Sequence, residues 1–278
     1  MIVVVESGAT KAHWVFLEGH SVVKHLYTAG LNPNAVSLGQ MRKEIAVVQM
    51  QAKELPAHLK IFFYGAGCLG EEGAQKLHSA LKNHFPDAAI SVKSDLVAAG
   101  IALYGKGSGV VSILGTGSSC CYYRNGAIQY VAPSLGYLLG DEGGGFSLGK
   151  ELLNRYAYGL LPLELTEMFA AAFPSDSLVA ELYKSPSPAG YLAQFVPFMV
   201  NNFQHPYVKQ LVKEAFERYI QRQVVPVCTK CGTASIGVVG SVGVLFSTIL
   251  EPVAAQYGLC VDGFVQYPID ALIQYHSS

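Results

Sequence analysis

Short apolar runs alternate with glycine-rich turns over the first hundred residues. Residues 2–5, 14–17 and 22–27 are rich in β-branched or aromatic side chains, and turns separate them, which predicts three successive strands. Apolar positions between residues 38 and 55 have helical spacing, so we expect a helix that ends at Pro56. The same reasoning predicts a strand at 60–64, a helix at 71–85, a strand at 90–93 and a helix at 95–104.

A glycine-rich segment at residues 107–109 ends this pattern, and a similar pattern begins after it. Strands are expected at 110–114, 120–123 and 127–131, again with a Gly/Thr turn after the first. Because both halves begin with three strands, we predict an α/β protein of two related domains, residues 1–105 and 106–278, facing each other across a cleft. Helices are expected at 146–158, 163–173, 189–202, 207–223, 244–257 and 269–275, and strands at 236–239 and 261–264.

Charged side chains are scarce in this chain. They make up 14% of the 278 residues, against about 25% in an average soluble domain, and the formal net charge is −1. A disordered chain is excluded, because it would be poor in apolar residues, whereas 51% of this chain is hydrophobic. The lack of a basic excess argues against a nucleic-acid partner. Surface buried in a homodimer would account for part of the charge deficit, so we expect a homodimer.

The uncharged stretch at residues 231–250 is long enough to cross a bilayer. Nine of its residues are Gly, Ser or Thr, however, and a glycine turn interrupts it, so a strand, a turn and a helix explain it better. The apolar run at the start of the chain is too short for a signal peptide and has no basic segment before it. We therefore expect a cytoplasmic protein without a membrane partner.

Three glycine turns follow apolar strands and carry hydroxyl side chains. Such turns expose successive backbone N–H groups and let a phosphate approach closely, although they also join strands that bind nothing. Two of them occupy equivalent places in the two halves, which favours nucleotide phosphates. The sequence has no P-loop spacing, and no Gly-x-Gly-x-x-Gly motif opens the first strand–helix unit, where a dinucleotide-binding fold would carry it. The turns are Gly8-Ala9-Thr10-Lys11, Gly115-Thr116-Gly117-Ser118 and Gly240-Ser241-Val242-Gly243.

Two carboxylates lie beside the predicted strands of the first half. Glu6 ends the first strand, where a carboxylate suits Mg²⁺ or a metal-bound water. Asp95 follows a strand and begins a helix. It is either a helix-capping residue or a general base that accepts a proton from an attacking hydroxyl, and the residues alone slightly favour the cap.

Asp141 and Glu142 lie in an otherwise uncharged loop with glycines on both sides. Acidic residues in a loop usually do no more than solvate a surface. Here the preceding Leu138 and Leu139 are expected to be buried, so we expect the two acids to have a functional role.

Taken together, these motifs resemble the BadF/BadG/BcrA/BcrD-type ATPases of the actin/hexokinase/Hsp70 ATPase superfamily, and among them the N-acetylglucosamine kinase-like proteins. The resemblance covers almost the whole chain. It implies two ribonuclease H-like (actin-like ATPase) domains with mixed sheets around a central cleft, and a last helix, residues 268–278, that can pack back on the first domain. The matching residues, in family order, are 6–11, 30–33, 94–95, 113–118, 135–136, 139–143, 240–242 and 268–270.

The resemblance also implies an activity, the ATP- and Mg²⁺-dependent phosphorylation of N-acetylglucosamine or a related amino sugar at its 6-hydroxyl. Asp95 would then be the catalytic base, and Glu6 would lie at the metal. The phosphate loops would be formed by Gly8, Thr10 and Lys11 and by Gly115, Thr116 and Gly117, with Gly240 and Ser241 beside the adenosine. The sugar would be contacted by Asn32, Ser118, Ser119, Gly136 and Asp141.

Three positions depart from the family pattern. Glu6 stands where the family usually has Asp, Ser119 replaces an Asn whose amide can both donate and accept, and Leu135 stands where animal homologues commonly have Trp. Glu6 and Ser119 keep open a second function, that of a nucleotide- or sugar-binding regulator or sensor with weak or lost kinase activity. A third, an activator-type ATPase with an iron–sulfur cluster, would use the Cys-x-x-Cys motif of Cys228 and Cys231, and we rank it last.

Overall fold

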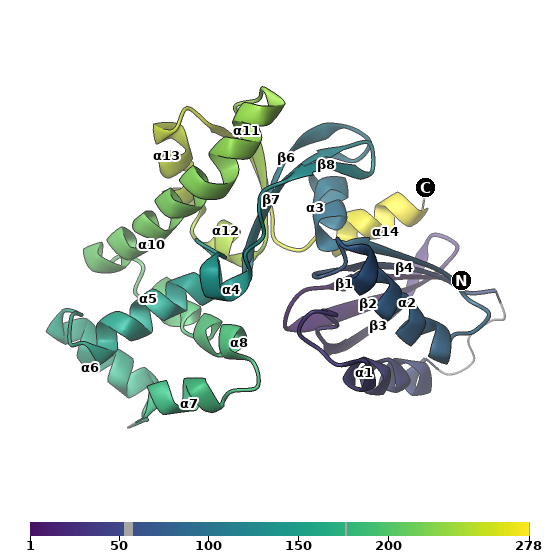
Figure 1. Ribbon diagram of the computed structural model, residues 1–278, viewed down its shortest axis with the longest axis horizontal. Coiled ribbons are helices and arrows are strands. Elements are labelled where there is room, and N and C mark those ends of the chain that lie inside the picture. Colours follow the sequence, from purple (N-terminus) through teal and green to yellow (C-terminus); the bar gives the residue numbers. More distant parts are fainter. Residues whose placement is uncertain (53–57, 176, 278) are drawn as a thin grey trace. The chain divides into compact units, whose positions relative to one another are not determined.

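The computed structural model describes residues 1–52, 58–175 and 177–277, and the chain forms two compact units in it (Figure 1). The chain has two mixed five-stranded sheets with helices, one in the first unit and one mostly in the second, which confirms the predicted α/β class. The predicted end of the first helix, at Leu55 and Pro56, lies outside the described residues. The first unit comprises Met1–Ser108, Tyr123–Ile128 and Tyr267–Ser278, and the second comprises Gly109–Tyr122 and Gln129–Gln266.

The first sheet has the strand order β3-β2-β1-β4-β5. Its first three strands form an antiparallel meander, and β4 and β5 continue the sheet in parallel with β1. Ser7, Gly65 and Ser94 are therefore neighbours at the carboxyl edge of the three parallel strands. The strands are β1 (Ile2–Ser7), β2 (Lys11–Glu18), β3 (Ser21–Ala29), β4 (Lys60–Gly65) and β5 (Ala89–Ser94).

Helices cover both faces of this sheet. Val3 of β1 packs into a buried cluster with residues of α1 and α2, whereas Val4 points to the opposite face and is buried outside that cluster. On that second face α14 packs against α3 and β1, and its His276 stacks on Phe62 with ring centroids 3.9 Å apart. The His276 Nε2 atom also lies 2.8 Å from the Tyr64 hydroxyl. The helices are α1 (Leu38–Gln51), α2 (Glu71–His84), α3 (Asp95–Tyr104) and α14 (Ile269–Ser277).

The second sheet repeats the topology of the first. Its order is β8-β7-β6-β9-β10, and β9 runs parallel to both β6 and β10. The turn between β6 and β7 thus corresponds to the turn between β1 and β2, as the repeated sequence pattern predicts. The strands are β6 (Ser108–Leu114), β7 (Ser118–Arg124), β8 (Ala127–Val131), β9 (Ser235–Val239) and β10 (Cys260–Val265).

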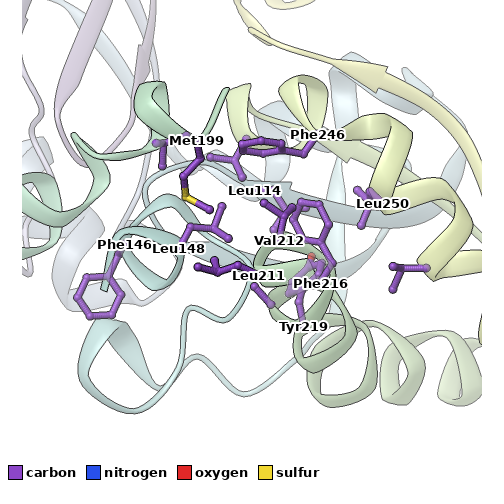
Figure 2. Close-up of a cluster of buried hydrophobic side chains, with 14 of the residues drawn as sticks. Leu114, Phe146, Leu148, Met199, Leu211, Val212, Phe216, Tyr219, Phe246 and Leu250 are labelled. Atoms are coloured by element: carbon purple, nitrogen blue, oxygen red, sulfur yellow. The ribbon is translucent and has the colours of Figure 1, made fainter. Parts of the chain in front are cut away.

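Helices pack with this sheet around one large apolar core. Figure 2 shows part of it, with Leu114 of β6 and with Phe216 and Tyr219 of α10. The helices of this unit are α4 (Gly136–Leu139), α5 (Gly145–Ala157), α6 (Leu163–Ala172), α7 (Leu178–Lys184), α8 (Pro188–Ala193), α9 (Val196–Asn201), α10 (Pro206–Tyr219), the π-helical turn η1 (Ile220–Val224), α11 (Val225–Cys231), α12 (Ser241–Leu245) and α13 (Ser247–Gln256).

Prolines account for two differences from the predicted helices. The helix expected at 189–202 is divided into α8 and α9, because Pro197 is tolerated only in the first turn of a helix. The helix expected at 207–223 instead continues through η1 to Cys231. In η1 the N–H of Val225 bonds to the carbonyl of Ile220, five residues back, immediately before Pro226. A proline lacks the N–H that a regular α-helical turn needs here, so the chain takes a wider turn.

The uncharged stretch at residues 231–250 contains the end of α11, β9, Gly240, α12 and the start of α13, so the predicted strand is confirmed. The turn predicted at 240–243 is shorter than expected, because α12 begins at Ser241, and the helix predicted at 244–257 is divided into α12 and α13. Ile236 and Val238 of β9 belong to the core of the second unit. In the described part of the chain, no helix combines the length and apolar character that crossing a bilayer requires.

Candidate active site

Glu6 and Asp95 lie at the carboxyl edge of the first sheet. Because side chains alternate along a strand, Glu6 shares the face of Val4, and Asp95 begins α3 on that face. Burial and the charge of Asp95 raise the pKa of Glu6 to about 7, although Lys11 opposes the shift. Burial also raises the pKa of Asp95. Interacting carboxylates with raised pKa values are typical of acid–base sites and of cation sites.

Hydrogen bonds at the start of α3 hold the Asp95 carboxylate in place. Ser94 is the N-cap residue, and its Oγ accepts from the N–H of Leu96 at 3.2 Å. Oδ1 of Asp95 accepts from the same N–H at 2.9 Å and from the Ser94 hydroxyl at 2.8 Å. The capping role that the sequence allowed for Asp95 is thus performed by Ser94. Both of these bonds engage Oδ1, and Oδ2 is the oxygen suited to accept a proton.

The donor set around Glu6 fits Mg²⁺. Magnesium is usually held by one or two carboxylates together with substrate phosphates and water. Burial and the charge of Asp95 both disfavour the ionised form of Glu6, a form that a bound cation would favour. The Lys11 ammonium lies over the ring of Tyr27, 3.9 Å from its centroid. No three His, Cys, Asp or Glu side chains gather as a metal site among the described residues, so phosphate and water oxygens would complete the coordination.

Neutralising Glu6 is expected to stabilise the metal-free protein at high pH. A carboxylate whose folded pKa is raised stabilises fully below its unfolded value, near 4.5, and loses that contribution as the pH rises through about 7. Glu6→Gln removes the titration, so its advantage over the wild type should grow between pH 5 and pH 8, to on the order of 3 kcal/mol. Thermal unfolding in EDTA across this range measures it.

The matched control is Glu18→Gln, which neutralises an exposed carboxylate at the end of β2. Its difference from the wild type should stay nearly constant over the same pH range. An equally constant difference for Glu6→Gln would contradict a raised pKa.

The first glycine turn is fixed by hydrogen bonds. Gly8 N–H donates to the carbonyl of Lys11 at 3.0 Å, and Gly30 N–H donates to the carbonyl of Thr10 at 3.1 Å. Ser7 Oγ accepts from the N–H of Leu31 at 3.0 Å, which joins the end of β1 to the next loop. To reach a phosphate, the Lys11 ammonium would have to leave the ring of Tyr27.

Asn32 lies just beyond Leu31 and forms a local turn. Its Oδ1 accepts from the N–H of Asn34 at 2.9 Å, and its backbone carbonyl accepts from the N–H of Val36, also at 2.9 Å. The side-chain oxygen is therefore engaged within the loop, and Nδ2 is the atom that can donate to a sugar hydroxyl.

The second glycine turn directs backbone N–H groups away from α5. The carbonyls of Gly115 and Thr116 accept from the N–H groups of Gly145 and Phe146, each at 2.8 Å. In a trans peptide the carbonyl and the following N–H point in opposite directions. The N–H groups of Thr116 and Gly117 consequently point away from α5, as a phosphate-binding turn requires.

Asp141 packs against the end of this turn. It has a left-handed backbone (φ +58°), and its Oδ1 accepts from the N–H of Ser118 at 3.3 Å. A Cβ atom at Gly117 would lie 2.7 Å from Oδ2 of Asp141, so only glycine fits there without displacing the acid. Burial raises the pKa of Asp141, and the charge of Glu142 raises it further, although the hydrogen bond from the Ser118 N–H opposes the shift. Of the predicted sugar contacts, the structure thus brings Asp141 and Ser118 together.

The expectation that Leu138 and Leu139 are buried is wrong. They are 73% and 76% exposed, whereas Glu142 is only 8% exposed. The single turn of α4 presents its leucines to solvent and the acidic residues after it turn inward. The expectation that Asp141 and Glu142 have a functional role therefore rests on the burial and hydrogen bonds of these two residues.

The remaining predicted positions lie at separate points of the second unit. Ser119 follows Ser118 in β7, so its side chain points to the opposite face, and its carbonyl accepts from the Tyr219 hydroxyl at 3.0 Å. Gly136 is exposed at the start of α4. Gly240 (φ +112°) follows β9 and precedes Ser241, the first residue of α12; a Cβ atom on Gly240 would lie 3.2 Å from the Gly115 nitrogen.

Sequence reasoning missed Arg222 and Gln223. Both lie in η1, where Arg222 Nη1 contacts Glu142 Oε1 at 2.8 Å and Gln223 Nε2 donates to Glu142 Oε2 at 3.0 Å. The one available signal was Pro226 inside a helical pattern, which indicates an irregular turn before it. The cysteines predicted as possible cluster ligands lie in α11, and Cys228 is buried in the apolar core, which does not favour a surface cluster.

Comparison with solved structures finds the same fold in sugar kinases. A protein from Porphyromonas gingivalis, provisionally described as an N-acetylglucosamine kinase, matches with a TM-score of 0.89 and 30% identity over 100% of this chain and 99% of that one. A Chromobacterium violaceum protein with the same provisional description matches with a TM-score of 0.77 and 17% identity over 99% and 98% of the two chains. A ROK family glucokinase from Streptomyces griseus, solved with glucose and AMPPNP, matches with a TM-score of 0.58 and 12% identity over 98% and 97%.

The matches to the Chromobacterium violaceum protein and to the Streptomyces griseus glucokinase show the fold alone, because the identities are low. No protein-family model and no curated protein matches the chain, so membership of the BadF/BadG ATPases stays a prediction. The first likeness extends over both complete chains. With 30% identity over that length, this chain belongs to the same family as the Porphyromonas gingivalis protein, with the two-domain actin-like ATPase fold of sugar kinases.

Proposed function

We propose that the protein is an ATP-dependent sugar kinase that phosphorylates N-acetylglucosamine or a related amino sugar at the 6-hydroxyl. The observation that carries this proposal is the full-length likeness to the Porphyromonas gingivalis protein. The ATP requirement is supported by the glucokinase of the same fold that was solved with an ATP analogue. In this proposal the two glycine turns at equivalent strand ends and the carboxylates of the first unit would supply the groups that phosphoryl transfer needs.

Asp95 is the proposed general base. Oδ1 is held by the N–H of Leu96 and the Ser94 hydroxyl, and Oδ2 would accept the proton of the sugar hydroxyl. A base works best when its pKa lies near the working pH, and burial moves that of Asp95 upward in this direction. The carboxylate is thus both oriented and more basic than an exposed aspartate.

The turns are the proposed phosphate sites. In the second, the N–H groups of Thr116 and Gly117 point away from α5, toward the side where phosphate oxygens would bind. In the first, Gly8, Thr10 and Lys11 would bind phosphate oxygens after the Lys11 ammonium leaves Tyr27. Glu6 would hold Mg²⁺, which when bound would neutralise part of the phosphate charge. Asn32, Ser118, Ser119, Gly136 and Asp141 remain the proposed sugar contacts, and Gly240 and Ser241 the proposed adenosine contacts.

The second candidate is a nucleotide- or sugar-binding regulator with weak phosphoryl transfer. Glu6 favours it, because its raised pKa means that the carboxylate at the proposed metal position is partly protonated at neutral pH when no cation is bound. Both candidates bind the same ligands. They differ in whether the bound sugar acquires a phosphate.

A coupled ADP-release assay over a panel of hexoses and amino sugars separates the two. We expect N-acetylglucosamine or a close relative to raise ADP release, and mass spectrometry to find the sugar phosphate. The matched substrate control is 6-deoxy-N-acetylglucosamine, which keeps every group except the proposed acceptor and should give no turnover.

Three outcomes would contradict all or part of the proposed activity. ATP binding without any sugar-dependent ADP release would overturn the kinase proposal and support the regulator. Turnover of the 6-deoxy sugar would place the transferred phosphate on another hydroxyl. Turnover confined to sugars without an amino substituent would contradict the proposed substrate class.

A further inference from the structure

A buried glutamine joins two loops of the second unit. Gln223 Nε2 lies 3.0 Å from both Ser118 Oγ and Glu142 Oε2. The exposed fractions are 7% for Gln223, 9% for Ser118 and 8% for Glu142, so water competes little for these bonds. Ser118 begins β7 after the second glycine turn, and Glu142 follows Asp141 in the acidic loop. One amide therefore connects the two segments that hold proposed ligand contacts.

The charge of Glu142 determines which way the amide points. Burial would raise the pKa of Glu142, but hydrogen bonds from Arg222, from its own backbone and from Gln223 together hold it below its usual value. An ionised carboxylate only accepts, so the Gln223 nitrogen must face it. The same nitrogen then donates to Ser118 Oγ, and the Ser118 hydroxyl proton is left to point elsewhere as a donor.

The π-helical turn places Gln223 at this position. Tyr219, Arg222 and Gln223 all reach the same region, since Tyr219 donates to the carbonyl of Ser119 while the other two contact Glu142. Isolated π turns inside helices occur frequently at functional sites. Arg222 is largely exposed, with 61% of its side-chain surface accessible, so its ion pair adds less than the buried amide.

We propose that Gln223 is a positioning residue of the sugar site. By bridging Ser118 and Glu142, it holds the loop that carries Asp141 against the second glycine turn, where Asp141 Oδ1 accepts from the Ser118 N–H. The inference rests on the proposed function, because Asp141 and Ser118 are sugar contacts only in a sugar kinase or sugar-binding protein. Gln223 itself touches neither sugar nor nucleotide in this proposal.

Gln223→Leu removes both hydrogen bonds at similar volume. The KM for the sugar should rise about tenfold while the KM for ATP changes by less than about twofold, as expected for a lost buried hydrogen bond to a charged partner. Hydrogen exchange should also quicken at the amide of Gly144, whose bond to the Asp141 carbonyl (3.1 Å) closes the loop. A general loss of folding would change both KM values and exchange throughout the unit.

The control variant is Gln221→Leu. Gln221 lies in the same π turn but is exposed and bonds to the Tyr257 hydroxyl at 2.7 Å. The variant should leave the sugar KM and the Gly144 exchange unchanged. If Gln223→Leu folds poorly, Gln223→Asn retains an amide that is too short to bridge both partners and should show the same selective effect.

A double-mutant cycle tests the route of action. If Gln223 acts through Ser118, the double variant Gln223→Leu/Ser118→Ala should raise the sugar KM by less than the product of the two single-variant fold-changes. Equal effects of the Gln223 and Gln221 variants on both exchange and sugar KM would overturn the positioning role. A wild type that turns over no sugar would instead defeat the proposed function, while the exchange measurement still tests Gln223.

Discussion

Asp95→Asn is expected to lower sugar-dependent ADP release by about 10²- to 10⁴-fold, the usual contribution of a positioned general base. The amide cannot accept the proton of the attacking hydroxyl. Its Oδ1 can still accept from the N–H of Leu96 and the Ser94 hydroxyl, so α3 should begin as before. Removing a buried carboxylate whose pKa is raised should leave the fold as stable or slightly more stable.

Steady-state kinetics and unfolding measured on the same preparations check this result. The KM values for sugar and ATP should change little, because the loss concerns the chemical step. Wild-type activity should rise with pH through the raised pKa of Asp95, and the residual activity of the variant should lack that rise. Asp87→Asn, at an exposed turn before β5, is the matched control. Near-normal turnover in Asp95→Asn would remove Asp95 from the catalytic role.

Gly240→Ala is expected to destabilise the second unit strongly. Gly240 has a φ of +112°, which L-residues rarely adopt, and an added Cβ would lie 2.4 Å from the Leu114 carbonyl oxygen. The contact is with backbone, so no side-chain rotation relieves it. A loss on the order of 4 kcal/mol follows from strain and overpacking together.

Thermal unfolding should show this loss as a Tm lowered by roughly 10 °C. Gly39→Ala is the matched control, because Gly39 lies in α1 with open space around its Cβ position, and alanine favours the helix. That variant should be as stable as the wild type or slightly more stable. If Gly240→Ala and Gly39→Ala have the same Tm, then β6 does not lie close enough to the Gly240 turn to clash with an added methyl group.

The sequence was informative wherever local pattern and position in the fold agree. Each half begins with alternating apolar runs and glycine turns, and both sheets follow that order. Asp95–Tyr104 was predicted to the residue, because a polar cap precedes an apolar run that glycine ends. The divided helix at Pro197 and the π turn before Pro226 were missed, because periodicity over a long window conceals one irregular turn.

The candidate site was predictable only in part, for a similar reason. Glycine turns and acids after strands can be recognised from neighbours in sequence, as with Glu6 and Asp95. Gln223 could not be found in this way, since its partner Ser118 lies 105 residues earlier and the contact depends on the π turn. Leu138 and Leu139 show the opposite error, in which apolar composition suggested burial although the single turn of α4 leaves them exposed.

The position of α14 has a consequence for the order in which the chain is made. The first unit starts at β1, yet it is completed by α14, whose His276 ring stacks on Phe62 and lies beside the Tyr64 hydroxyl. A ribosome must therefore add the whole of residues 109–266 before it supplies the helix that completes the earlier unit. During that interval part of one face of the nascent sheet, beside α3, lacks the helix that packs on it in the folded unit.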